Sequence, residues 1–93
     1  MLRHICMFKL VSADEADTFI EKAQSLRAIE CVKGFDVVKN AKGLPESNFT
    51  VSLIIDFDSK EALDSYQVNP VHKEFAGYVA TVKTDRACID YEF

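Results

Sequence analysis

Two kinds of hydrophobic periodicity alternate along this chain, and their order limits the folds that it can adopt. Four segments repeat every second residue, as strands with one buried face do: residues 2–10, 35–40, 49–57 and 87–93. Residues 13–28 and 58–79 place apolar side chains at helical spacing instead. The order strand, helix, strand, strand, helix, strand is that of ferredoxin-like folds. We therefore expect an α+β fold, with a four-stranded antiparallel sheet and two helices on one of its faces.

The two predicted helices carry start signals of their own. Ser12, with Glu15 three residues later, forms a capping-box pattern, and Asp58 with Glu61 repeats it with Asp as the cap. Pro70 interrupts the second helix, because it lacks a backbone N–H, and it suits the first position of a new helix. We expect the first helix to be continuous and the second to bend or restart at Pro70.

Length and charge argue against several kinds of protein. The 93 residues are enough for one domain, spanning residues 1–93, and leave little surplus stability for a monomer. A net charge of −4 without a basic stripe argues against nucleic-acid binding. No apolar run approaches the roughly 20 residues of a membrane span. No signal-peptide cleavage site follows the first strand, so we expect a cytoplasmic protein.

Three cysteines, Cys6, Cys31 and Cys88, form no C-x-x-C pair. An odd number in a chain without a signal peptide favours reduced thiols over disulfides. Cys6 lies inside an apolar strand, where a cysteine is more often a small buried hydrophobe than a reactive thiol. We therefore expect three reduced cysteines.

One face of the predicted sheet has no helix to cover it. Five apolar side chains are expected there: Ile5, Met7, Val38, Ile54 and Cys88. Lys9 and Asp56 interrupt this face, so it is only partly apolar. A large apolar patch that is left uncovered predicts a partner, and a two-fold pairing of sheet on sheet is the simplest arrangement. We therefore expect a homodimer.

Several segments resemble the stress-responsive A/B barrel (Dabb) family. Residues 3–10 are similar to the family's opening strand, with its His and Lys. The last predicted strand is similar to the family's final strand. Residues 57–72 resemble its signature, in which a strand ends in Phe, a helix carries Tyr66 and a Pro-x-His turn ends at His72. Asn69 departs from the His that often precedes this proline. The resemblance covers nearly the whole chain. It implies a dimeric α+β barrel with a pocket between each sheet and its own helices.

The resemblance also implies candidate site residues. A plant polyketide cyclase of this family closes a ring by aldol condensation without a cofactor, and three of its pocket groups correspond here to His72 as acid/base, Tyr66 and His4. Two others, a His and a Tyr, are replaced here by Val51 and Ala23. These residue types suit the chemistry, since His titrates near neutral pH and a Tyr hydroxyl can orient the base or hold a carbonyl. Three further side chains would form apolar walls around a flat ligand: Phe8, Leu53 and Phe75.

Each candidate also has a purely structural explanation. His72 could brace the helix restart, His4 could satisfy a buried polar contact, and Tyr66 could pack with its hydroxyl bonded. We interpret Asp90 and Tyr91 as residues that make sheet or dimer contacts. His4 and His72 are too few ligands for a metal ion, so neither a metal nor another cofactor is expected.

Three functions remain open from the sequence. The first is a Dabb-type dimer, with a role in stress, that binds a small apolar or aromatic ligand. The second is a cofactor-free enzyme like the polyketide cyclase, with His72 as acid/base and Tyr66 beside it. The third is a cofactor-free monooxygenase of the same superfamily, which shares the fold, although a fold alone does not determine function.

Overall fold

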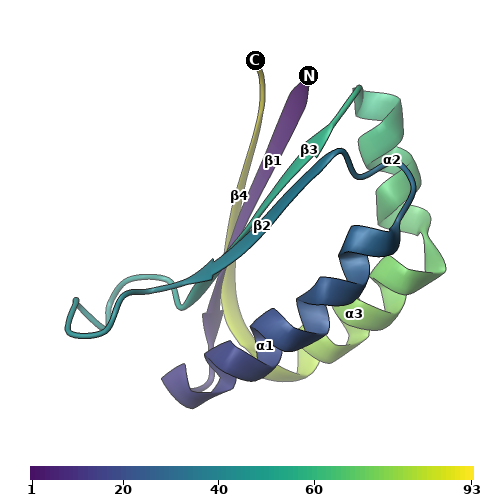
Figure 1. Cartoon of the computed structure of the whole chain (residues 1–93). Coiled ribbons are helices and arrows are strands. Elements are labelled where there is room, and N and C mark those ends of the chain that lie inside the picture. Colours follow the sequence, from purple (N-terminus) through teal and green to yellow (C-terminus); the bar gives the residue numbers. More distant parts are fainter.

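The computed structural model describes every residue from Met1 to Phe93. The strands are β1 (Leu2–Leu10), β2 (Gly34–Lys39), β3 (Val51–Phe57) and β4 (Lys83–Glu92), and they form one antiparallel sheet in the order β2-β3-β1-β4. On one face of it lie α1 (Ala16–Ala23), α2 (Lys60–Val68) and α3 (Pro70–Val82) (Figure 1). Short 3₁₀ segments, η1 (Ala13–Glu15) and η2 (Gln24–Ala28), extend α1 at its two ends. The predicted ferredoxin-like fold is confirmed. None of the helices is long and apolar enough to cross a membrane.

The first helical segment covers its expected span, but its start is built differently. The Ser12 hydroxyl accepts a hydrogen bond from the backbone N–H of Asp14. Glu15 does not complete the capping box, because its carboxylate accepts a hydrogen bond from the Tyr78 hydroxyl at 2.8 Å. Burial and this hydrogen bond raise the pKa of Tyr78 to about 12. Glu15 therefore joins the start of the first helix to α3.

The second helical segment is divided at Pro70, as expected. The hydroxyl of Ser59 accepts a hydrogen bond from the backbone N–H of Ala62, so Ser59 caps α2 and the predicted cap, Asp58, does not. The side chain of Asn69 caps α3, and Pro70 occupies its first position. Asn69 has an extended backbone, with φ −64° and ψ 136°, which is the conformation that a following proline favours. The chain therefore restarts at Pro70 as a separate helix.

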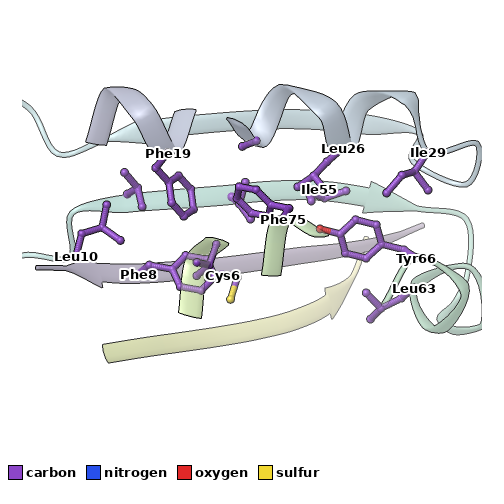
Figure 2. Close-up of a cluster of buried hydrophobic side chains, with 14 of the residues drawn as sticks. Cys6, Phe8, Leu10, Phe19, Leu26, Ile29, Ile55, Leu63, Tyr66 and Phe75 are labelled. Atoms are coloured by element: carbon purple, nitrogen blue, oxygen red, sulfur yellow. The ribbon is translucent and has the colours of Figure 1, made fainter. Parts of the chain in front are cut away.

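The core lies between the sheet and the helices (Figure 2). Alternate residues of β1 and β3 point into it, and its most completely buried side chains include Phe19, Leu26, Ile55 and Phe57. Burial of one such side chain contributes about 1.5–3 kcal/mol. α1 packs on β2 and β3, and α2 packs on β3, but no helix makes a comparable contact with β4. The helix-side face of β4 is therefore left largely open.

The opposite face of the sheet carries the predicted apolar side chains, with one exception. Ile5 lies between Ile54 on β3 and Ile89 on β4, and Ile89 is 60% exposed. Cys88 does not belong to this face, because it pairs with Cys6, whose side chain points into the core. The predicted placement of Cys88 is wrong, since Ile89 and its alternate neighbours form the apolar face of β4.

Two of the charges on this open face, those of Arg3 and Asp56, are paired with each other. Arg3 donates to both oxygens of the Asp56 carboxylate, at 2.7 and 3.0 Å. This contact holds the pKa of Asp56 below its usual value and raises that of Arg3. A Cβ atom at Gly34 would lie 2.8 Å from the Asp56 carboxylate, so a larger residue there would displace one partner of the pair. Lys9 turns away to the backbone carbonyl of Asn48, at 2.8 Å. These contacts lower the polarity of the face around Arg3 and Lys9, while Asp36 and Asp85 lie on it without an ion-pair partner.

A disulfide joins Cys6 on β1 to Cys88 on β4. The two residues lie directly opposite each other, with Cα atoms 4.3 Å apart. The expectation of three reduced cysteines is therefore wrong for this pair, and only Cys31 is free. The spacing of cysteines in the sequence does not reveal the pairing, because it depends on the register between the first and the last strand.

Candidate functional site

A cavity of about 350 Å³ opens where α3 meets β1 and β4. All six side chains proposed from the sequence line it: His4, Tyr66, His72, Phe8, Leu53 and Phe75. Six more were not anticipated: Cys6, Gln67, Ala76, Val79, Lys83 and Arg86. The volume lies at the lower end of the range for sites that hold small organic ligands.

His4 forms part of the buried end of this cavity. Its side chain belongs to the helix-side face of β1, and its Nδ1 lies 2.5 Å from Oδ1 of Asp90. Because a carboxylate only accepts, Nδ1 carries the proton and Nε2 is the nitrogen left for a ligand. Asp90 was expected to make only a sheet or dimer contact. The register of β1 with β4 places it opposite His4, where it satisfies the buried ring and also orients it.

His72 lies in the first turn of α3 and is half-buried. Its Nδ1 lies 3.1 Å from the backbone carbonyl oxygen of Gln67, so Nδ1 carries the proton here as well. Burial lowers the pKa of His72, and the hydrogen bond to Gln67 opposes this effect only partly. The ring is therefore neutral at pH 7, with a lone pair on Nε2 that can accept a proton.

The ring of Tyr66 lies near both histidines. The centre of its ring is 6.5 Å from that of His4 and 4.5 Å from that of His72. The ring also packs on Phe57, at 5.1 Å, and only 1% of the residue is exposed. Figure 2 shows its hydroxyl pointing away from α2, into the layer between sheet and helices. Burial raises the pKa of Tyr66, so the hydroxyl stays protonated and can donate a hydrogen bond.

The walls of the cavity are apolar and firmly supported. Phe8 from β1 and Phe75 from α3 both pack against Phe19, with ring centres 5.4 and 5.2 Å from it. Leu53 and Val79 complete these walls, and both are buried. Since Phe19 is itself completely buried, the aromatic walls are held in place by the core. A flat apolar molecule would meet a preformed surface here.

One cluster in the structure has the residue types of a metal site. The ligand atoms of His4, Cys6 and Cys88 lie within 4.8 Å of one another. A cysteine binds a metal as its thiolate, and both sulfur atoms are instead engaged in the disulfide. In this oxidised form the cluster therefore offers a single strong ligand, His4.

The family model of the stress-responsive A/B barrel domain, Dabb, matches residues 2–93. The chain belongs to the Dabb family. The resemblance predicted from the opening strand and from residues 57–72 is thereby confirmed. No curated protein matches the chain.

Solved structures similar to this Dabb chain share its fold over its whole length. A dimeric protein of unknown function with a ferredoxin-like fold, from Bacteroides fragilis, is 27% identical, with a TM-score of 0.83 over 99% of this chain and 95% of that chain. A protein from Arabidopsis thaliana is 26% identical, with a TM-score of 0.80 over 100% of this chain and 95% of that chain. An antibiotic biosynthesis monooxygenase is 13% identical, with a TM-score of 0.80 over 100% and 98% of the two chains. At that identity the likeness concerns the fold alone.

Proposed function

We propose that this Dabb protein binds a small apolar or aromatic molecule in the cavity between its sheet and its helices. The observation that carries the proposal is the meeting of three polar side chains, those of His4, Tyr66 and His72, in a cavity with aromatic and aliphatic walls. An apolar pocket with a few convergent polar groups is the usual composition of a small-molecule site. The two Nε2 atoms and the Tyr66 hydroxyl would orient the ligand through hydrogen bonds.

The test is a calorimetric titration with 1-naphthol, a flat aromatic molecule with one hydroxyl. A ligand of this size should bind with a Kd of about 10 μM to 1 mM. Ala76→Leu would extend a side chain into the cavity and should abolish binding. Ala80→Leu, one turn further along α3 and outside the cavity lining, is the matched control and should bind normally. The proposal is wrong if the wild type shows no saturable binding, or if Ala76→Leu binds as well as the wild type does.

We also propose that the protein is a homodimer formed through the open face of the sheet. The similar protein from Bacteroides fragilis is described as dimeric, and the centre of this face is apolar, with Ile89 largely exposed. Sedimentation should give twice the mass of the chain for the wild type and a single chain for Ile89→Glu. Val68→Glu changes an equally exposed side chain on α2 and should remain dimeric. A monomeric wild type, or a dimeric Ile89→Glu, would contradict this assembly.

A second candidate function is proton transfer without a cofactor, as in a polyketide cyclase. The neutral ring of His72, with Nε2 open beside Tyr66, favours it. Nε2 would remove a proton next to a carbonyl, and the Tyr66 hydroxyl would donate a hydrogen bond to the enolate oxygen that forms.

Exchange of the methyl protons of 2-acetylnaphthalene for deuterium, followed by NMR, tests this chemistry without knowledge of the natural substrate. The protein should accelerate the exchange. His72→Ala should lower the protein-dependent rate by about 100-fold or more, the usual contribution of a general base. The acid/base role is excluded if His72→Ala and Tyr66→Phe both exchange at the wild-type rate.

The monooxygenase alternative is favoured only by a shared fold, which does not carry an activity. Protein-dependent oxygen uptake with 1,4-naphthoquinol would support this alternative. Uptake at the rate of the buffer alone would exclude it. A role in stress and a cytoplasmic location stay predictions.

A further inference from the structure

The open end of the cavity is positively charged. Among its twelve lining residues are Lys83 and Arg86, and none is Asp or Glu. The chain as a whole has 15 acidic and 11 basic residues, so the excess of basic side chains in this lining is opposite to that of the whole chain. Both cations come from the uncovered strand β4 and are exposed, whereas the opposite end of the cavity is buried. The cavity therefore runs from a polar, cationic mouth to an apolar interior.

Neither cation is paired within the protein. The five ion pairs of the structure involve other residues. The nearest carboxylates along β4 are directed elsewhere. Asp85 alternates with Arg86 along the strand and so belongs to the other face, while Asp90 is held by His4. The Arg86 guanidinium, with five N–H donors, and the Lys83 ammonium are therefore available to an anion.

The cationic mouth lies close to the polar groups of the interior. Arg86 is opposite Phe8 in the sheet, two residue pairs along from Cys88 and Cys6. Its charge also helps to lower the pKa of His72, after the larger effect of burial. A ligand whose aromatic part packs between Phe8 and Phe75 would thus reach Arg86 with a substituent at one end.

We propose that the ligand of this cavity is an amphipathic acid, with an apolar or aromatic body and one carboxylate that Arg86 and Lys83 bind at the cavity mouth. The inference rests on the proposed function, because it names the class of molecule that the same site takes. A guanidinium can donate two parallel N–H···O bonds to one carboxylate, whereas an ammonium acts as a point charge. Arg86 is therefore the specific anchor, and Lys83 adds attraction.

The experiment compares two probes that differ in charge and little in shape, 1-naphthylacetate and 1-naphthylacetamide, by calorimetry at about pH 7.5 and low salt. The wild type should bind the acid at least about 10-fold more tightly than the amide, as expected for a charge-assisted bidentate contact. Arg86→Gln should remove most of this preference, chiefly by weakening the affinity for the acid. Lys83→Gln should reduce the preference by a smaller factor.

Lys73→Gln is the control for loss of a positive charge, because Lys73 lies on α3 outside the cavity lining. It should keep the wild-type preference. Equal affinity for the two probes in the wild type would overturn the inference, as would a preference for the acid that survives in Arg86→Gln. Both results would still leave the cavity as a binding site. The absence of binding by either probe would instead contradict the proposed function itself.

Discussion

The helix-covered face of the sheet is built in two different ways. Over β3 the layer is filled, and Ile55 and Phe57 are completely buried. Beside β1 and β4 the same layer leaves a cavity of about 350 Å³. The difference follows from helix coverage, because α1 and α2 pack on β2 and β3 while no helix covers β4 to a similar extent. On the helix side β4 accordingly carries Arg86, Cys88 and Asp90, all of them exposed.

This contrast separates stability from binding within one layer. The filled half gives the fold its apolar core, and the half with the cavity holds the polar groups that a ligand would meet. A disulfide and the Asp90–His4 contact join β4 to β1 where helix packing does not. Changes in the filled half should therefore act on stability, and changes around the cavity should act mainly on binding.

The largest expected effect is the truncation of Ile55 on β3, which can be compared with the truncation of Leu53 on the same strand. Ile55 is completely buried in the filled half, whereas Leu53, two residues earlier on the same face, borders the cavity. Ile55→Ala should cost about 3–5 kcal/mol of unfolding free energy, and Leu53→Ala at least about 1 kcal/mol less, because fewer packing contacts surround it. Urea unfolding of both variants measures this difference. Equal costs would show that the two halves are packed alike.

Loss of the disulfide should have the next largest effect. Cys6 and Cys88 are 82 residues apart, so the bond restricts most of the unfolded chain, and Cys88→Ala should lower the unfolding free energy by about 2–4 kcal/mol. Dithiothreitol should destabilise the wild type to a similar degree and leave Cys88→Ala unchanged. Cys31→Ala removes the free thiol and should still respond to dithiothreitol. A wild type that is insensitive to dithiothreitol would mean that β4 is held without the bond.

Two tyrosines, one away from the cavity and one in its lining, allow a smaller, paired test. The Tyr78 hydroxyl donates to Glu15, so Tyr78→Phe should cost about 0.5–1.5 kcal/mol of stability. Tyr66→Phe should change stability by less, since no protein group bonds its hydroxyl, but should weaken 1-naphthol binding several-fold because the residue lines the cavity. Thermal unfolding and calorimetry on both variants check this. The reverse pattern would assign Tyr66 to the core alone.

The smallest expected effect is a dependence of stability on pH through His72. Burial lowers its pKa in the folded protein, so the unfolded chain takes up the proton first. The stability that the neutral ring contributes is complete above the unfolded pKa of about 6.5 and is lost as the pH falls through the lower folded value. Urea unfolding between pH 5 and 8 should show this decline, and His72→Gln should flatten it. If His72→Gln has the same dependence of stability on pH as the wild type, the decline does not come from His72.

The fold could be predicted because its signals are local. The alternation of residues 2–10 and the helix restart at Pro70 each depend on short stretches of chain, and both agree with the structure. The family resemblance pointed to His4, Tyr66 and His72, which the structure brings together at one cavity.

The rest of the site depends on the pairing of the first strand with the last. Asp90 contacts His4, and Cys88 bonds Cys6, only because the register of β4 places them opposite each other. The usual rule, that the apolar side of a strand faces the core, fails for β4. Its apolar side, with Ile89, faces away from the helices, since no helix covers the other side. Arg86 was missed because the predicted last strand began at residue 87, whereas β4 begins at Lys83.

The central claim is that the cavity side of the molecule binds a small aromatic ligand, and amide NMR shifts during a titration with 1-naphthol test it most directly. We predict saturable shifts concentrated at His4, Gln67, Val79 and Arg86, with little change at Leu26 in the filled half. Shifts that do not saturate, or that centre on Ile89 and the open face of the sheet, would contradict the account.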